Sequence, residues 1–183
     1  MKKVAILALL ALELAVSGCN TGTPSTTVTT TTSGNWEAEM TGGIGPASEL
    51  NFVTAFAVTS TNGGSSQALN ITGFGFINSA ACFVSGETES GSASLTTNST
   101  NQVSGSMTYT VTSGTPAGNV LTLTTSPNGG VSGTASGTPG TTGTLSNGVA
   151  WGSWTLTAGP DTPDCAGSGT FIMCQGSNTC TVP

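Results

Sequence analysis

Apolar and polar side chains alternate along most of the chain beyond residue 34, and this period of two predicts β-strands. Trp36, Ala38 and Met40 alternate with polar residues, which indicates a strand with one buried face. Residues 50–59 and 103–111 repeat the pattern, the second most regularly. Further short strand candidates lie at 68–77, 81–84, 120–125, 131–137, 141–145, 150–157 and 169–174.

Turn-forming residues interrupt these windows at short intervals. Asn62-Gly63-Gly64, Pro139-Gly140 and Asn147-Gly148 are typical of breaks between strands, and a change of phase near Gly73 indicates a bulge. Because Thr, Ser and Gly dominate, we predict no helix beyond residue 19. Short strands with frequent turns predict an all-β domain.

The architecture that we predict for this domain is an antiparallel up-and-down meander of about eight to ten strands that closes into a barrel. Exposed sheet edges are commonly protected by lysines or other charges. Charged residues make up only 5% of this chain, and closing the sheet removes the edges without them. A two-sheet β-sandwich is the alternative.

Residues 1–18 have the features of an export signal. Lys2 and Lys3 precede an apolar run over residues 4–12, which predicts a short helical signal segment rather than a stable membrane span. The segment leads into Val16-Ser17-Gly18-Cys19, which resembles the lipobox of bacterial lipoproteins. The resemblance implies that the signal peptide is removed immediately before the cysteine.

The lipobox resemblance also implies that Cys19 carries acyl chains, which would attach the mature chain to the cell envelope. Asn20 stands where lipoproteins kept in the inner membrane tend to have aspartate, which implies the outer membrane where the cell has one. Residues 20–33 are mostly threonine and have no apolar periodicity. We therefore predict a lipidated, disordered tether at 19–33 and a single β domain at 34–183.

The charge of the mature chain excludes several functions. Lys2 and Lys3 are the only basic side chains, they leave with the signal segment together with Glu13, and the chain has no histidine. The remaining side chains carry a charge of −7. Without cations they cannot neutralise phosphates, so we expect no nucleic-acid partner. A nucleophilic serine or cysteine would also lack a base, so we expect no enzyme of that kind, and no cofactor.

Lipidation of Cys19 would leave Cys82, Cys165, Cys174 and Cys180 of the five cysteines. An even number in an exported chain predicts two disulfides, with three possible connectivities. We favour Cys82–Cys165 and Cys174–Cys180, because the second pair closes a short loop of turn-forming residues. The first pair would close a loop of roughly 80 residues and add about 4–5 kcal/mol of stability. A zinc site is the alternative, but the chain has neither histidine nor paired CxxC spacing.

Gly34-Asn35-Trp36, at the start of the first expected strand, is similar to the G-x-W motif that opens lipocalin and avidin-type barrels. This resemblance implies a barrel that binds a small ligand. Ala81-Cys82-Phe83 and the stretch from Cys165 to Phe171 resemble segments of uncharacterised Thr/Ser/Gly-rich bacterial lipoproteins. That second resemblance supports the pairing of Cys82 with Cys165 and implies no activity.

Trp151 and Trp154 are the candidate contact residues. They are three residues apart on an expected strand, so their side chains should point to opposite faces of the sheet. If one fills the core, the other lies outside, where it could stack on a sugar ring or contact a partner. The alternative is that a loop or a neighbouring sheet covers both.

Two pairs of carboxylates, Glu37 with Glu39 and Glu87 with Glu89, are each expected to share a strand face, at about 6.5–7 Å between backbones. This spacing is compatible with a glycosidase. Acidic residues opposite an apolar face are more often solvated surface, and we favour that interpretation.

Asp161 and Asp164 lie in a proline-rich loop and are weak candidates for a calcium site. No EF-hand spacing surrounds them. We favour a turn stabilised by their side chains, and therefore expect no metal.

These patterns predict a lipid-anchored envelope protein without enzymatic activity. Our leading hypothesis is a lipocalin-like module for a small apolar or neutral ligand, because the meander and the G-x-W motif suggest it. A surface structural or adhesive module that binds neutral glycan or protein is the second, and a carboxylate-pair glycosidase is the weakest. Unfilled volume inside a barrel would favour the first, and a packed interior with an outward tryptophan would favour the second.

Overall fold

The fold of the chain is all-β, as predicted. The structure is a computed structural model that describes residues 29–32, 34–60, 64–78, 80–83, 86–115, 117–136, 142–176 and 181–183. Two short 3₁₀ turns, η1 (Gly45–Ser48) and η2 (Pro163–Cys165), accompany the strands. The predicted signal segment, Cys19 and most of the predicted tether lie outside the described residues. Within those residues, no helix is long and apolar enough to span a membrane.

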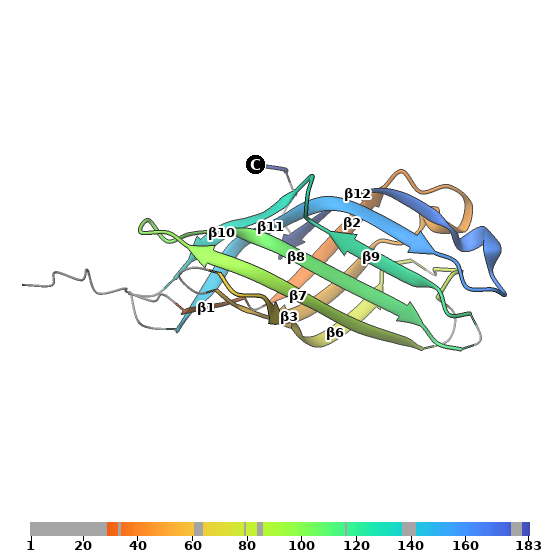
Figure 1. The fold of residues 1–183 in the computed structure, drawn as a ribbon, viewed down its shortest axis with the longest axis horizontal. Helices are drawn as coiled ribbons and strands as arrows, with labels where there is room; N and C mark the ends of the chain where they lie inside the picture. Colours follow the sequence, from red (N-terminus) through yellow and green to blue (C-terminus); the bar gives the residue numbers. More distant parts are fainter. Residues whose placement is uncertain are drawn as a thin grey trace, which may run out of the picture.

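The main strands form an antiparallel meander (Figure 1). Its members are β2 (Asn35–Thr41), β3 (Phe52–Ala57), β6 (Asn70–Phe76), β7 (Glu87–Thr97), β8 (Gln102–Ser113), β9 (Val120–Thr124), β10 (Gly130–Ala135), β11 (Thr142–Thr157) and β12 (Gly167–Gln175). Their order in the sheet is β7-β8-β10-β11-β12-β2-β3-β6. β9 and β10 both lie between β8 and β11, one after the other, and so occupy one position. β12 then returns to β2, so the last strand meets the first.

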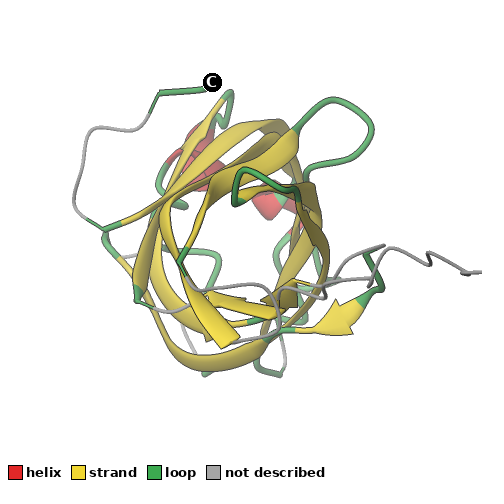
Figure 2. Ribbon diagram, turned by 90° about the vertical axis from the view of Figure 1, so that its left-hand side faces the viewer, coloured by secondary structure: helices red, strands yellow, loops and turns green. Residues whose placement is uncertain are grey.

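A single segment connects the two ends of this path. β5 (Gln67–Ala68) pairs with β7, whereas β6, which begins after Leu69, pairs with β3. The amide of Leu69 donates to the carbonyl of Gly91 at 2.9 Å. Gly91 has no side chain, and a Cβ there would lie only 2.6 Å from Cδ1 of Leu69. The sheet is therefore a partly closed ring, which Figure 2 shows end on.

Sheet pairing begins inside the range that we predicted to be a disordered tether. β1 (Thr29–Thr32) runs parallel to Thr142–Leu145 of β11 and antiparallel to β4 (Thr59–Ser60). Threonine is β-branched and favours extended backbone, so a threonine run can add to an available strand edge. The domain therefore extends on the N-terminal side of Gly34.

Three local features that the sequence predicted can be compared with the structure: one is confirmed and two are wrong. The register of β3 and β6 shifts opposite Gly73, which confirms the expected bulge. Asn147-Gly148 does not separate two strands, because Asn147 adopts a positive φ of 52° within a continuous β11 and marks a bulge there. Residues 81–84 were expected to form a strand, but Phe83 N bonds to Ala80 O at 2.9 Å in a turn.

Aromatic side chains fill the middle of the ring. The ring of Phe52 stacks on that of Tyr109 at 5.5 Å and tilts against that of Phe74 at 5.0 Å. The Tyr109 hydroxyl is 2.7 Å from Oγ1 of Thr54, which donates in turn to the carbonyl of Gly73 at 3.0 Å. Other fully buried side chains are those of Trp36, Leu50, Val111, Leu121, Leu123, Trp154 and Met173.

One end of the ring is fastened by a disulfide and a buried amide. Cys82 and Cys165, one of the two expected pairs, are bonded, with 5.7 Å between their Cα atoms. Asn119 is completely buried beside them, where its Nδ2 donates to Cys82 O at 2.7 Å. Its Oδ1 accepts from Gly159 N at 2.7 Å and from Thr162 Oγ1 at 2.6 Å. Cys174 is disulfide-bonded too, and its expected partner, Cys180, lies outside the described residues.

Candidate functional site

The two tryptophans of β11 lie on opposite faces of the strand. Trp154 points into the ring, where it is 1% exposed and its Nε1 donates to the carbonyl of Thr41 at 3.0 Å. Trp151 is half-buried and lies on the outer face, since its neighbours Ala150 and Gly152 are buried. Of the two candidates, Trp151 is therefore the one placed to contact a ligand.

The cross-strand neighbours of Trp151 are determined by the register of three strands. Gly130 of β10 is its partner on one side and Ile172 of β12 on the other, and Glu39 of β2 follows Ile172. A Cβ at Gly130 would lie 3.3 Å from the Cη2 atom of the Trp151 indole. The tip of the indole ring therefore lies close to Gly130 of β10, where a side chain would crowd it.

These residues line a surface groove of about 340 Å³, here called the Trp151 groove. Apolar contact comes from Trp151 and Ile172, whereas Glu39 supplies a carboxylate. The groove is lined by Glu39, Thr41, Asn128, Trp151, Gly152, Thr170, Phe171, Ile172 and Val182. Hydroxyls of Thr41 and Thr170 lie 2.7 Å apart at its side. A flat apolar surface beside hydroxyl and amide groups can hold a ring that has one apolar face and a polar rim.

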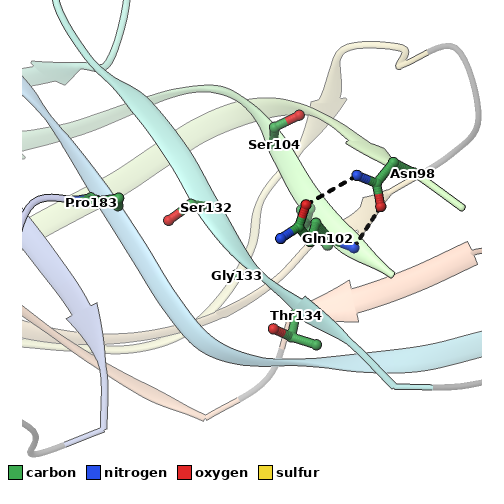
Figure 3. Close-up of a pocket in the computed structure, with 8 residues that line it drawn as sticks. Asn98, Gln102, Ser104, Ser132, Gly133, Thr134 and Pro183 are labelled. Atoms are coloured by element: carbon green, nitrogen blue, oxygen red, sulfur yellow. Dashed lines mark hydrogen bonds between the residues drawn. The ribbon is translucent and has the colours of Figure 1, made fainter. Parts of the chain in front are cut away.

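A second groove, of about 470 Å³, lies over β8 and β10 and is here called the polar groove. It is lined by Asn98, Gln102, Val103, Ser104, Ser132, Gly133, Thr134 and Pro183, none of which has a charged side chain. Figure 3 shows Asn98 bonded to Gln102 on one side of this groove, with Ser132 and Pro183 farther along. Asn98 Nδ2 donates to Gln102 Oε1 at 3.2 Å, which leaves the Gln102 Nε2 hydrogens available.

The two pairs of carboxylates differ in their surroundings. Glu37 and Glu39 lie on the outer face of β2, opposite the buried Trp36 and Ala38, as predicted. Glu87 and Glu89, by contrast, share a face of β7 with buried residues of the ring interior and are half-buried themselves.

Glu89 is therefore the acidic residue whose environment is least like water. Burial, and then the charge of Glu87, raise the pKa of Glu89. Burial also raises the pKa of Tyr109 far above its ordinary range, and the carboxylate of Glu89 contributes to that rise. This arrangement lies on the inner face of β7, away from both outer grooves.

The calcium candidates, Asp161 and Asp164, are both exposed near η2. Among the described residues, no group of three or more Asp, Glu, Cys or His side chains is arranged to hold a metal ion.

Among the described residues, one buried side-chain polar atom inside the ring has no hydrogen-bond partner. The Nε1 of Trp36 is buried and makes no hydrogen bond with any described residue. The indole ring stacks on Phe56 at a centroid distance of 5.1 Å. A buried donor without a partner costs about 1–3 kcal/mol and is a place where a water molecule or a ligand atom would be stabilised.

Comparison of the chain with protein-family models, with curated proteins and with solved structures finds no match. Function is therefore inferred from the side chains and geometry of this chain alone. Sequence reasoning identified Trp151 but missed Gly130, Ile172, Glu39 and Asn128 as its neighbours. Strand register brings Gly130, Ile172 and Glu39 to the side of Trp151, and Asn128 lies in the turn before β10. From the sequence, only the alternation along each strand could have suggested which residues face outward.

Proposed function

We propose that this protein is a lipid-anchored envelope protein, attached through Cys19, whose β domain binds an uncharged glycan in the Trp151 groove. The outward indole of Trp151 supports this proposal most directly, because it lies beside Ile172 in a groove with hydroxyl and amide groups at its sides. Aromatic surfaces stack on the apolar face of a sugar ring, and hydroxyls and amides can bond to its rim.

The charge of the chain supports an uncharged ligand. Glu39 is the charged side chain that lines the Trp151 groove, and the whole chain has a net charge of −6. An anionic polysaccharide would be repelled both by Glu39 and by the overall field of the domain. A neutral sugar avoids this cost and can donate a hydroxyl hydrogen bond to the carboxylate.

The filled interior supports the outer groove over the ring centre as the main binding surface. Phe52, Tyr109 and Trp154 are at most 1% exposed and occupy the space that a lipocalin-like ligand would need. The role that we propose is binding without catalysis. A surface that binds neutral glycan would serve a structural or adhesive module at the cell envelope, and a protein partner is the alternative occupant of the same groove.

Affinity electrophoresis tests the glycan. The full chain would be run through gels that contain neutral polysaccharides, together with Trp151→Ala and the control Ile77→Ala, which removes an exposed apolar side chain elsewhere (48% exposed). We expect at least one neutral polysaccharide to slow the wild type and the control but not Trp151→Ala. Equal mobility of all three proteins in every gel would contradict the proposal.

Intact mass measurement tests the anchor. Protein extracted from membranes should begin at Cys19 and carry the mass of acyl chains. A Cys19→Ser variant should lack the acyl mass and, without the lipobox cysteine before which the chain is cut, should keep residues 1–18. An unlipidated N-terminus in the membrane-extracted wild type would contradict the anchor.

A small neutral ligand inside the ring is a second candidate, and the unpartnered Nε1 of Trp36 favours it. A ligand acceptor at that position would satisfy the buried donor. Trp36→Phe keeps the stacking on Phe56 and removes the donor, so binding of an interior ligand should weaken in this variant and remain in Trp151→Ala. The opposite result would assign the ligand to the outer groove.

A further inference from the structure

The Trp151 groove and the polar groove are neighbours on one outer face. The first lies over β2, β12 and β11, and the second over β10 and β8, which follow in the same sheet. Outward positions of β10 connect them. Gly130 lies beside the Trp151 indole, whereas Ser132 and Thr134 line the polar groove.

The distance along this connection suits a chain molecule better than a single sugar. The four residue steps of β-strand from Gly130 to Thr134 span about 14 Å. Val182 lines the first groove and Pro183 the second, so the two grooves are adjacent. The outer face therefore offers an aromatic surface at one end and a polar surface that continues from it.

The polar groove presents hydrogen-bonding groups that the protein leaves free. The Nε2 of Gln102 and the hydroxyls of Ser132 and Thr134 make no hydrogen bond within the described part of the chain. Hydroxyl and amide groups both donate and accept, which matches the hydroxyls of a sugar chain. No charged side chain lines this groove, which favours an uncharged chain as the ligand.

The backbone beneath both grooves argues against an extended peptide as the occupant. Each of β8, β10, β11, β12 and β2 is bonded to a neighbour on both sides. A peptide that adds to a sheet needs a free edge with unpaired backbone groups. Only side chains are available on this face, and they supply stacking and hydrogen bonds rather than a strand template.

We propose that the two grooves form one binding track for an extended, uncharged polysaccharide, with one sugar on Trp151 and later sugars bonded to Gln102, Ser132 and Thr134. This inference rests on the proposed function of the Trp151 groove and extends it from a single sugar to a chain. It identifies the polar groove as a binding subsite for the sugars that follow the one on Trp151.

Calorimetric titration with neutral oligosaccharides, from monomer to hexamer, tests the track. The probes are oligomers of β-linked glucose, xylose and N-acetylglucosamine, added to the full chain in detergent. Affinity should rise with length until the polar groove is filled. The double variant Gln102→Ala/Thr134→Val should bind the longer oligomers about 10-fold more weakly, on the scale of a pair of hydrogen bonds, and the shortest ones unchanged. Asn70→Ala, which removes an exposed amide on β6, is the matched control and should bind as the wild type does.

The outcomes separate this inference from the proposed function. Binding that requires Trp151 but does not depend on oligomer length, or that is unaffected in Gln102→Ala/Thr134→Val, overturns the track and leaves the Trp151 groove as a single-sugar site. Absence of Trp151-dependent binding of any of these oligomers overturns the proposed function, and the track with it. A loss at all lengths in Gln102→Ala/Thr134→Val also overturns the division into two subsites.

Discussion

β11 carries one tryptophan on each of its two faces, and the surroundings of the two side chains differ. Trp154, on the inner face, is 1% exposed and its indole N–H is bonded to Thr41 O. Trp151, three residues earlier on the outer face, is half-buried and lies beside Gly130 and Ile172 at the surface. The inner tryptophan makes its contacts within the protein. The outer face, by contrast, leaves an aromatic surface and several polar groups available to a ligand. Stability should therefore depend on the inner face and binding on the outer one.

Replacement of each tryptophan by alanine should give the sharpest contrast. Trp154→Ala removes a fully buried side chain and should lower the free energy of unfolding by about 3–5 kcal/mol. Trp151→Ala should lower it by less than about 1 kcal/mol, since most surface substitutions cost little. Denaturant unfolding of both variants against the wild type measures the two values. Equal losses would mean that Trp151 is a core residue and would contradict the division of roles between the two faces.

The fastened end of the ring should show the next largest effect. Asn119→Ala leaves Gly159 N and Cys82 O without their buried partner, and we expect a loss of about 1–3 kcal/mol. Asn98→Ala is the matched control, because it removes an amide from an exposed turn. Thermal unfolding with the disulfide intact compares the two variants. If Asn119→Ala is as stable as the Asn98→Ala control, the three loops around Asn119 are held by other contacts.

Glu89 places a half-buried carboxylate on the inner face of β7. Its effect on stability should be smaller than the effects above and should depend on pH. Its raised pKa means that the folded protein holds the proton more tightly than the unfolded chain does. Stability should therefore rise as the pH falls from neutral through the folded-state pKa towards the ordinary value of 4.5, and the destabilising effect of the charge should be complete above that folded-state pKa.

Glu89→Gln removes this ionisation. The variant should be more stable than the wild type at neutral pH, and the difference should shrink as the pH approaches 4.5. Unfolding curves over this range measure it, with Glu49→Gln as an exposed control. A wild type that instead gains stability relative to Glu89→Gln as the pH rises would mean that the carboxylate has a favourable partner in the fold.

Much of the fold could be predicted from the sequence, because strands with one buried face show it in their alternation. β2, β3 and β8 are such strands, and the alternation placed the buried apolar residues of each strand on one face. Apart from Glu87 and Glu89, which were expected to share a strand face, β7 was not predicted as a strand, since Ala93 and Leu95 are its only apolar side chains among serines, threonines and glutamates. Its strand conformation comes from pairing with β8 along its whole length, which is a tertiary effect.

The candidate site was predicted only in part, for a related reason. The spacing of Trp151 and Trp154 required opposite faces, but did not say which of them faces inward. That depends on the bulge at Asn147, which changes the phase of β11 after Leu145 so that Ala150, Gly152 and Trp154 are buried. The polar groove could not be foreseen, because Gln102 and Thr134 meet only through the register of β8 with β10.

Tryptophan fluorescence tests the central claim most directly. Of the three tryptophans, Trp36 and Trp154 are 1% exposed, so a soluble quencher should reach Trp151 alone. We predict one quenchable component, its loss in Trp151→Phe, and its protection by a bound neutral oligosaccharide. A quenchable component that persists in Trp151→Phe, or oligosaccharide binding that leaves Trp151 as accessible as before, would contradict the account.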